Sequence, residues 1–421
     1  MERQNRLITG LLLAFLVLVL VAYFGKEPAK KADDDSPPER KVLEWKSDDV
    51  TSLELAGPGR TVTFAKTDGV WKMTAPKEAP AEERKVTEIV DRITGLEVEE
   101  REITGNLADF GLDPEHRTAV TLKKADGTSA TVYVGKDTPV GYRTYVAEKP
   151  DGPVLLAATR IGEMAQRGPD DFRAREPWRV SSATARRVRV EDAGRSVVLR
   201  KDDHGWWLGD EGPRVDEAKV QDWLAKASAL RAETFHDGVD PASLGLASAT
   251  TTIQVEDDTG THALRYGNRD AGGVDVLGDQ GPAMRLGPEA LELLILDGWT
   301  SSELLTVRRW QVDTIEVQLG DVTARLAKKD GKWTDAAGKE VEVDALLDAV
   351  ESGTADRARA DVPAPATPWG KVVLAEGATR REEVTIGEPV DGGRVAKDAA
   401  GGPPFVVPQA TIDAIVAAVP K

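Results

Sequence analysis

Stretches in which apolar and polar residues alternate recur along the chain in three similar sets. They read SLELAGPGRTVTFAKTDGVW, RVRVEDAGRSVVLRKDDHGWW and TIEVQLGDVTARLAKKDGKW. A period of two around a glycine-containing turn is typical of a half-buried β-hairpin. Each hairpin ends in Gly-x-Trp, which places Trp71, Trp207 and Trp333 at equivalent positions, and a tryptophan (Trp45, Trp178, Trp310) opens each set. The pattern therefore predicts an internal repeat.

A helical pattern follows each hairpin. Val86, Ile89, Val90 and Ile93 stand at the spacing that places them on one face of an α-helix. The same spacing recurs at Val220, Trp223, Leu224 and Ala227, and again at Val343, Leu346, Leu347 and Val350. In this third helix, Asp344 is the expected N-cap.

More strand pattern follows each helix, after loops that read FGLDP, SLGL and TPWGK. Gly135, Gly267 and Gly387 recur in YVG, RYG and TIG, and a Gly-Pro pair then leads to a last strand and a closing helix. Consecutive strands are joined by short turns, which favours antiparallel pairing. The chain is therefore predicted to be an α+β protein with three tandem homologous repeats, built on mostly antiparallel sheets, over residues 42–177, 178–309 and 310–421.

Residues 7–24, LITGLLLAFLVLVLVAYF, carry no charge and would form about 27 Å of helix, close to the thickness of a bilayer core. We expect a transmembrane anchor within residues 1–25, followed by a flexible linker over 26–41. A cleaved signal peptide is the alternative, but its apolar stretch is usually shorter, and no small-x-small pair closes this one. The expected anchor residues include Leu7, Leu11, Leu12, Phe15, Leu18, Leu20, Tyr23 and Phe24.

The overall charge excludes one class of function, and the missing cysteines exclude several others. The net charge is −17, which argues against binding to the phosphates of nucleic acid. The chain has no cysteine, so disulfides, thiolate metal sites and thiol nucleophiles are all excluded. Because long domains that follow a signal anchor are translocated largely regardless of flanking charge, we expect the bulk of the chain outside the cytoplasm.

No residue set points to catalysis. The four histidines lack metal-site spacing, and no phosphate-binding loop or nucleophile elbow is present. Paired acids such as Asp257-Asp258 are expected to form turns and to be solvated. Trp71, Trp207 and Trp333 could form a platform for a glycan, but their equivalent positions at strand ends favour core packing. We therefore expect no catalytic, cofactor-binding or metal-binding residues, and Gly135, Gly267 and Gly387 join these tryptophans as repeat-core positions.

The basic tail, the apolar segment and the motifs DDVTSLEL, DGVW, DFGLDP and YVGK resemble the bacterial family called domain of unknown function 4340. The resemblance is clearest over residues 47–135 and extends through the repeats, although TPWGK departs from the pattern. It implies a membrane-anchored envelope protein often found beside ABC-type transporter components, including those of gliding-motility-like systems. It implies no catalytic residue.

Three hypotheses about function follow. The first is a non-enzymatic accessory or scaffold protein of the inner membrane, single-pass with its bulk in the periplasm, whose partners are integral membrane transport proteins. The second is an envelope sensor that binds a glycan or a peptide between repeats. The third is a hydrolase with an unfamiliar site. Convergent buried polar groups in one pocket would favour an enzyme, whereas a large exposed apolar patch would favour a scaffold.

Overall fold

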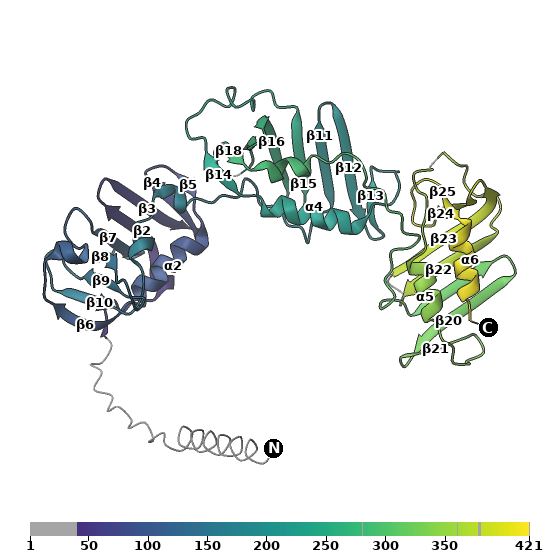
Figure 1. Cartoon of the computed structure of the whole chain (residues 1–421), viewed down its shortest axis with the longest axis horizontal. Coiled ribbons are helices and arrows are strands. Elements are labelled where there is room, and N and C mark those ends of the chain that lie inside the picture. The colour runs from purple at the N-terminus through teal and green to yellow at the C-terminus, as the bar shows by residue number, and fades with distance from the viewer. Residues whose placement is uncertain (1–39, 280, 360, 378–379, 421) are drawn as a thin grey trace, which may run out of the picture. The chain divides into compact units, whose positions relative to one another are not determined.

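The computed structural model describes residues 40–420 except 280, 360 and 378–379. These residues form three sheets with few helices (Figure 1), and the strand pairs described within them are antiparallel. The predicted antiparallel sheets are thus confirmed. The chain divides between Ala174 and Arg175 into two compact units, the first holding one sheet and the second holding two. The second and third predicted repeats therefore share a unit.

The predicted transmembrane segment, residues 7–24, lies outside the described residues. Within the described part of the chain, no helix is long and apolar enough to cross a membrane.

The first sheet has the strand order β1-β6-β10-β9-β8-β7-β2-β3-β4-β5. Leu53 and Leu55 of its strand β2 are fully buried, as the alternating pattern requires. In chain order the strands are β1 (Arg40–Lys41), β2 (Val50–Gly57), β3 (Arg60–Thr67), β4 (Val70–Ala75), β5 (Ala79–Pro80), β6 (Glu97–Ile103), β7 (Thr118–Lys124), β8 (Ser129–Asp137), β9 (Thr144–Ala147) and β10 (Val154–Ala157).

The second sheet has the order β13-β12-β11-β15-β16-β17-β18-β14, and the third has the order β21-β20-β19-β22-β23-β24-β25. The strands of the second sheet are β11 (Arg187–Asp192), β12 (Arg195–Asp202), β13 (Gly205–Leu208), β14 (Ala232–Phe235), β15 (Thr251–Glu256), β16 (Thr261–Asp270), β17 (Gly273–Leu277) and β18 (Met284–Leu286). Those of the third are β19 (Thr314–Leu319), β20 (Val322–Lys329), β21 (Lys332–Thr334), β22 (Gly370–Glu376), β23 (Arg380–Val390), β24 (Gly393–Asp398) and β25 (Phe405–Pro408).

The three sheets follow one path. In each sheet a three-stranded meander is followed by a helix and then by a second meander. The first strand of the second meander pairs with the first strand of the first meander, and these pairs are β2·β7, β11·β15 and β19·β22. In the first two sheets, the strand after the helix pairs with the last strand, in β6·β10 and β14·β18. In the third sheet only an isolated bridge, Asp356↔Val406, stands at that place.

The helix after each first meander buries the face that its spacing predicts. These helices are α2 (Glu83–Thr94), α4 (Glu217–Ala229) and α5 (Asp344–Glu351). α4 begins after Asp216, whose side chain accepts a hydrogen bond from the backbone N–H of Lys219. The expected N-cap at Asp344 is wrong, because Asp344 is the first helical residue and Val343 occupies the cap position without a side-chain hydrogen bond.

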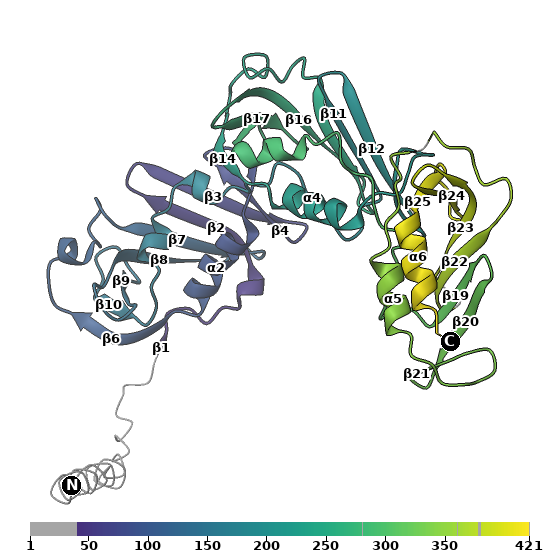
Figure 2. The same ribbon diagram turned by 45° about the vertical axis from the view of Figure 1, so that its right-hand side comes forward.

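The closing helices are not alike. α6 (Gln409–Ala418) is a regular helix that lies beside α5 over the third sheet (Figures 1 and 2). In the first sheet it is a single turn, α3 (Gly162–Ala165), and in the second a 3-10 helix, η4 (Pro288–Leu293). The remaining short 3-10 turns are η1 (Ser47–Asp49), η2 (Leu107–Phe110) and η3 (Pro169–Asp171).

The recurring glycines Gly135, Gly267 and Gly387 each lie at a β-bulge. The strand register shifts between Val134 and Asp137, between Tyr266 and Arg269, and between Ile386 and Pro389. At the first two bulges the loop after the helix crosses directly over the glycine. A Cβ atom on Gly135 would lie 2.3 Å from the carbonyl oxygen of Phe110, and one on Gly267 would lie 2.0 Å from that of Leu244. A bulge that another backbone segment approaches closely requires glycine.

Gly267→Ala should therefore destabilise the protein by about 1–3 kcal/mol, because the loop or the strand must move to admit the methyl group. Gly168→Ala is the matched control, since the nearest atom to its added Cβ would be 3.7 Å away. Denaturant unfolding of both variants measures the difference, and equal midpoints for the two would show that the close approach is not required.

Candidate functional site

The predicted core tryptophans are not equally buried. Trp71 and Trp207 are each 2% exposed, whereas Trp333 is only partly buried against the third core. The tryptophans that open the repeats differ more strongly. Trp178 is buried and donates a hydrogen bond to the carbonyl of Ala227, while Trp310 is 73% exposed. The predicted anchor residues lie outside the described part of the chain.

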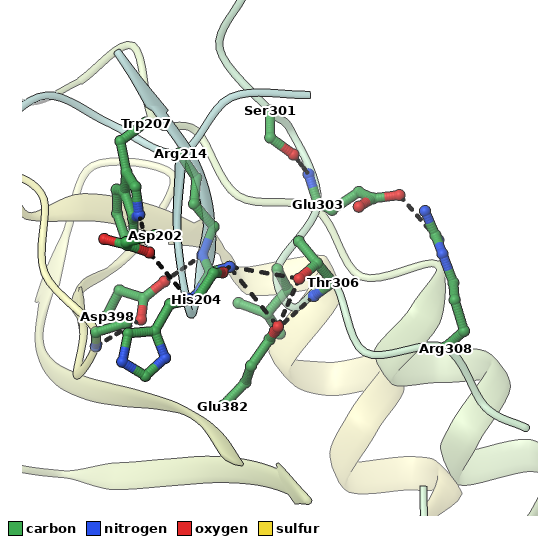
Figure 3. Close-up of polar contacts among 12 residues, drawn as sticks. Asp202, His204, Trp207, Arg214, Ser301, Glu303, Thr306, Arg308, Glu382 and Asp398 are labelled. Atoms are coloured by element: carbon green, nitrogen blue, oxygen red, sulfur yellow. Dashed lines mark hydrogen bonds and ion pairs between the residues drawn. The ribbon is translucent and has the colours of Figure 1, made fainter. Parts of the chain in front are cut away.

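Four charged side chains are buried together where the second sheet meets the third. Arg214 comes from the segment between β13 and α4, Glu382 from β23, Asp398 from the end of β24 and Arg357 from the segment after α5. Each is at most 4% exposed. We call these four residues the buried ionic cluster, and Figure 3 shows Arg214, Glu382 and Asp398 converging. These four side chains are among the most buried charged groups of the second unit.

Arg214 is the centre of the cluster. Its Nε donates a hydrogen bond to Oδ2 of Asp398 at 2.7 Å, and its Nη1 donates to the carbonyl oxygen of His204 at 2.7 Å (Figure 3). Its guanidinium carbon lies 5.0 Å from the centre of the Trp207 ring. One side chain of the second sheet thus binds a carboxylate of the third sheet while it covers a core tryptophan of its own sheet.

Glu382 binds the segment that links the two sheets. Its Oε2 accepts a hydrogen bond from the backbone N–H of Thr306 at 2.7 Å, and its Oε1 accepts one from the Thr306 hydroxyl at 2.5 Å. The same Oε1 lies 3.6 Å from Nη1 of Arg214. The linking segment is therefore held between both sheets.

Arg357 completes the charge balance. Its Nη2 donates hydrogen bonds to the carbonyl oxygens of Leu304 at 3.1 Å and Glu303 at 3.3 Å, and lies 3.9 Å from Oδ2 of Asp398. Its guanidinium carbon stacks 4.1 Å from the centre of the Phe405 ring. Two guanidinium groups thus face two carboxylates, which makes the formal charge of the cluster zero.

The two arginines respond differently to this setting. Burial lowers the pKa of Arg214, but the hydrogen bond and the charge of Asp398, together with Glu382, outweigh burial and raise it. Burial and repulsion by Arg214 lower the pKa of Arg357 to about 10, despite the attraction of Asp398 and Glu382. Both guanidinium groups are therefore charged at neutral pH.

The hydrogen bonds of the cluster suit it to hold two sheets together. Oδ1 of Asp398 accepts from the backbone N–H of Ala400, and its Oδ2 accepts from Arg214. Both oxygens of Glu382 accept from Thr306. Every carboxylate oxygen is thus engaged in the interior, so the arrangement acts as an ionic joint between sheets.

A hollow of about 540 Å³ opens beside this joint. Its lining includes Trp207 and charged side chains that already have partners, since Arg200 bonds Asp202 at 2.8 Å and Lys397 bonds the carbonyl of Gly402. The Trp207 ring contributes little surface to the hollow because it is 2% exposed. Within the described residues, no group of three or more acidic or histidine side chains could hold a metal ion.

Sequence reasoning did not find the joint. Glu382 gives the one usable signal, because it stands at an inward position of its strand, in phase with the buried Val384 and Ile386. An acidic residue at an apolar position of a strand indicates a buried partner. Arg214 gives no such signal because it follows a turn, and Asp398 is the last residue of its strand, directly before a turn. A distance of 184 residues along the chain separates the two.

A second polar cluster surrounds His262 in the second sheet. Its Nδ1 lies 2.8 Å from Oδ2 of Asp279, and its Nε2 lies 3.3 Å from Oδ1 of Asp257. Asp257 also accepts a hydrogen bond from the backbone N–H of Ser181. The expectation that the Asp257-Asp258 pair is solvated is wrong for Asp257, which is 1% exposed while it forms the turn to Gly260.

These contacts shift the pKa of both groups. Burial lowers the pKa of His262, but contacts with Asp279 and Asp257 outweigh burial and raise it above 6.5. Burial raises the pKa of Asp257, yet its hydrogen bonds from Ser181 and Thr259, with the charge of His262, lower it to about 2. The protonated imidazole and the ionised carboxylate therefore stabilise each other.

The fold and the joint define a class of protein: tandem antiparallel sheets, two of them joined by buried charges. The model of the family described as domain of unknown function (DUF4340) matches residues 71–249, which confirms the resemblance over that segment. No curated protein matches the chain. No solved structure matches it either.

Asp398→Asn should lower the free energy of unfolding of the second unit by about 3–5 kcal/mol, because Arg214 would lose its nearest counter-charge and the two buried arginines would face only Glu382. Denaturant unfolding followed by tryptophan fluorescence measures this loss. Glu340→Gln removes an exposed ion pair with Lys332 and should leave the midpoint unchanged. A double-mutant cycle with Arg214→Met should show strong coupling, and additive losses would contradict the joint.

The stability difference between the wild type and His262→Gln should be larger at pH 5 than at pH 8. A raised pKa means that the folded state favours protonated His262, so this contribution is full below the ordinary pKa of 6.5 and is lost as pH rises through the raised value. His204→Gln, whose side chain is exposed, is the control for loss of a histidine. A difference that grows with pH would contradict the assignment.

Proposed function

We propose that this protein is a non-catalytic scaffold of the cell envelope. It is anchored in the inner membrane by residues 7–24, with its three sheets outside the cytoplasm, and it is an accessory to an ABC-type transporter or a gliding-motility-like system. We further propose that the three sheets are tandem copies of one α+β unit. Their common strand path and the glycine bulges at Gly135, Gly267 and Gly387 support this reading.

The observation that carries the proposal is the buried ionic cluster. An enzyme places charged groups where substrate reaches them. Here the carboxylates of Glu382 and Asp398 accept hydrogen bonds in the interior, from Arg214, Thr306 and Ala400. A scaffold instead needs a defined spacing between its parts. A buried ion pair adds little net stability, but a misplaced partner leaves a charge desolvated, so the pair penalises other arrangements of the two sheets. A joint of this kind suits a protein that presents two sheets to a partner as one unit.

A ligand-binding sensor is the second candidate, and the hollow beside Trp207 is the feature that favours it. The hollow has a suitable size for a small glycan or peptide fragment. However, glycan recognition by stacking needs an open aromatic face, and here Arg214 covers one face of the Trp207 ring while Gly402 approaches it from the third sheet. We therefore rank the scaffold first.

Recovery of membrane transport proteins should depend on the sheets rather than on the anchor sequence. We would compare the full-length protein, a version that ends at Ala174, the boundary between the compact units, and a version whose residues 7–24 are replaced by an unrelated apolar helix. Partner recovery from detergent-solubilised membranes should survive the helix replacement and fall on truncation. Asp398→Asn is a finer test, because it loosens the joint while every surface is kept, and it should reduce recovery.

Two results would contradict the proposal. One is that every version is recovered without any membrane transport protein from cells that express such transporters. The other is that the protein turns over a substrate and loses this activity in a point variant of a pocket residue.

A further inference from the structure

The turn between β8 and β9, residues 138–143, is a well-braced projection from the first sheet. The strands pair up to Asp137↔Thr144, and beyond them the backbone N–H of Thr138 donates to the carbonyl of Arg143 at 2.8 Å. The hydroxyl of Thr138 also donates to the carbonyl of Val140 at 2.8 Å. We call residues 138–143 the β8–β9 tip, and these bonds give it a defined shape.

The tip presents two apolar side chains to solvent. Val140 is 83% exposed and Tyr142 is 79% exposed, which makes them the two most exposed large apolar side chains among the described residues. Single exposed apolar residues are common on protein surfaces, but here an aliphatic and an aromatic side chain stand two positions apart at one apex. Such a braced apolar apex indicates a contact surface.

The strand register places this tip at the end of the sheet where the described chain begins. Thr144 pairs with Ala157, Ala157 pairs with Val98, and Val98 pairs with Arg40. The first described residue thus lies in the same row of the sheet as the base of the tip. Arg143 closes the connection, since its Nε lies 2.5 Å from Oε2 of Glu99, the residue after Val98.

The length of chain before Arg40 keeps this row near the predicted anchor. Residues 25–39 separate the apolar run from the sheet, and the flexible linker predicted from the sequence would have a root-mean-square span of about 20 Å at that length. The distance across the row from β1 to β9 is three strand spacings, about 14 Å. The tip is therefore within reach of any bilayer that holds residues 7–24.

From this placement we propose that the β8–β9 tip seats Val140 and Tyr142 in the interfacial region of the bilayer. Tyrosine suits this region because its ring is apolar and its hydroxyl is polar. The two neighbouring arginines are already paired, since Arg143 binds Glu99 and Arg160 lies 3.1 Å from Asp137. Burial of the two apolar side chains, rather than attraction to anionic lipid, is then the driving force. This inference rests on the proposed membrane anchoring.

The test uses the full chain in nanodiscs of mixed phosphatidylcholine and phosphatidylglycerol without any other protein. Because the chain has no cysteine, Pro139→Cys gives a single labelling site for an environment-sensitive fluorophore on the exposed tip. Lipids with a spin label near the headgroup should quench this probe. The matched control is Ala125→Cys in the exposed β7–β8 turn, which lies at the opposite end of β8, and its probe should keep its unquenched intensity.

A second variant separates lipid contact from mere proximity. Pro139→Cys combined with Val140→Ser and Tyr142→Ser keeps the probe and the turn but removes both apolar groups, and its quenching should be lost. Quenching that survives these changes, or equal quenching at positions 125 and 139, would overturn the proposal. So would an unquenched tip in a protein that is stably inserted, whereas failure of the chain to insert at all would instead contradict the proposed anchor.

Discussion

The free-energy cost of burying charged side chains constrains how the second and third sheets of this protein are placed. Removal of a guanidinium group or a carboxylate from water costs several kcal/mol, and only well-placed partners return that free energy. Arg214, Arg357, Glu382 and Asp398 are all buried, so each depends on the others for its position. The linking segment at Thr306 is drawn into the same network. This network links the second sheet to the third, whose buried apolar residues form two separate clusters.

The regular elements could be predicted because their signals are local. Alternation in the three hairpins and the helical spacing of Val86, Ile89, Val90 and Ile93 depend on neighbours within a few residues, and the structure buries these side chains as expected. The glycines of YVG and RYG could be found as repeats. The structural reason for glycine at these positions could not be predicted. Gly135 lies against the carbonyl of Phe110, 25 positions earlier, and only folding brings the two together.

The joint lay beyond prediction for a related physical reason. Asp398 has the surroundings of an ordinary turn residue, and the sequence holds no record of Arg214 approaching from another sheet. Trp310 shows the opposite failure, because a well-matched repeat position is 73% exposed. A sequence repeat predicts the local elements of each copy well. It predicts poorly which side chains are buried where one copy meets the next, because each junction has different neighbours.

The strand order also has a consequence for how the protein is made. The central pair of each sheet joins distant segments, as in Leu53↔Leu122, Val188↔Val255 and Ile315↔Leu374. Contacts of such long range form slowly, and no sheet can close until its second meander has been synthesised. Arg214 must wait longest, because Glu382 and Asp398 lie near the end of the chain. The second sheet can therefore form its own hydrogen bonds before the guanidinium group of Arg214 has a carboxylate to bind. The position of the second sheet relative to the third is fixed only when strands β23 and β24 have been made.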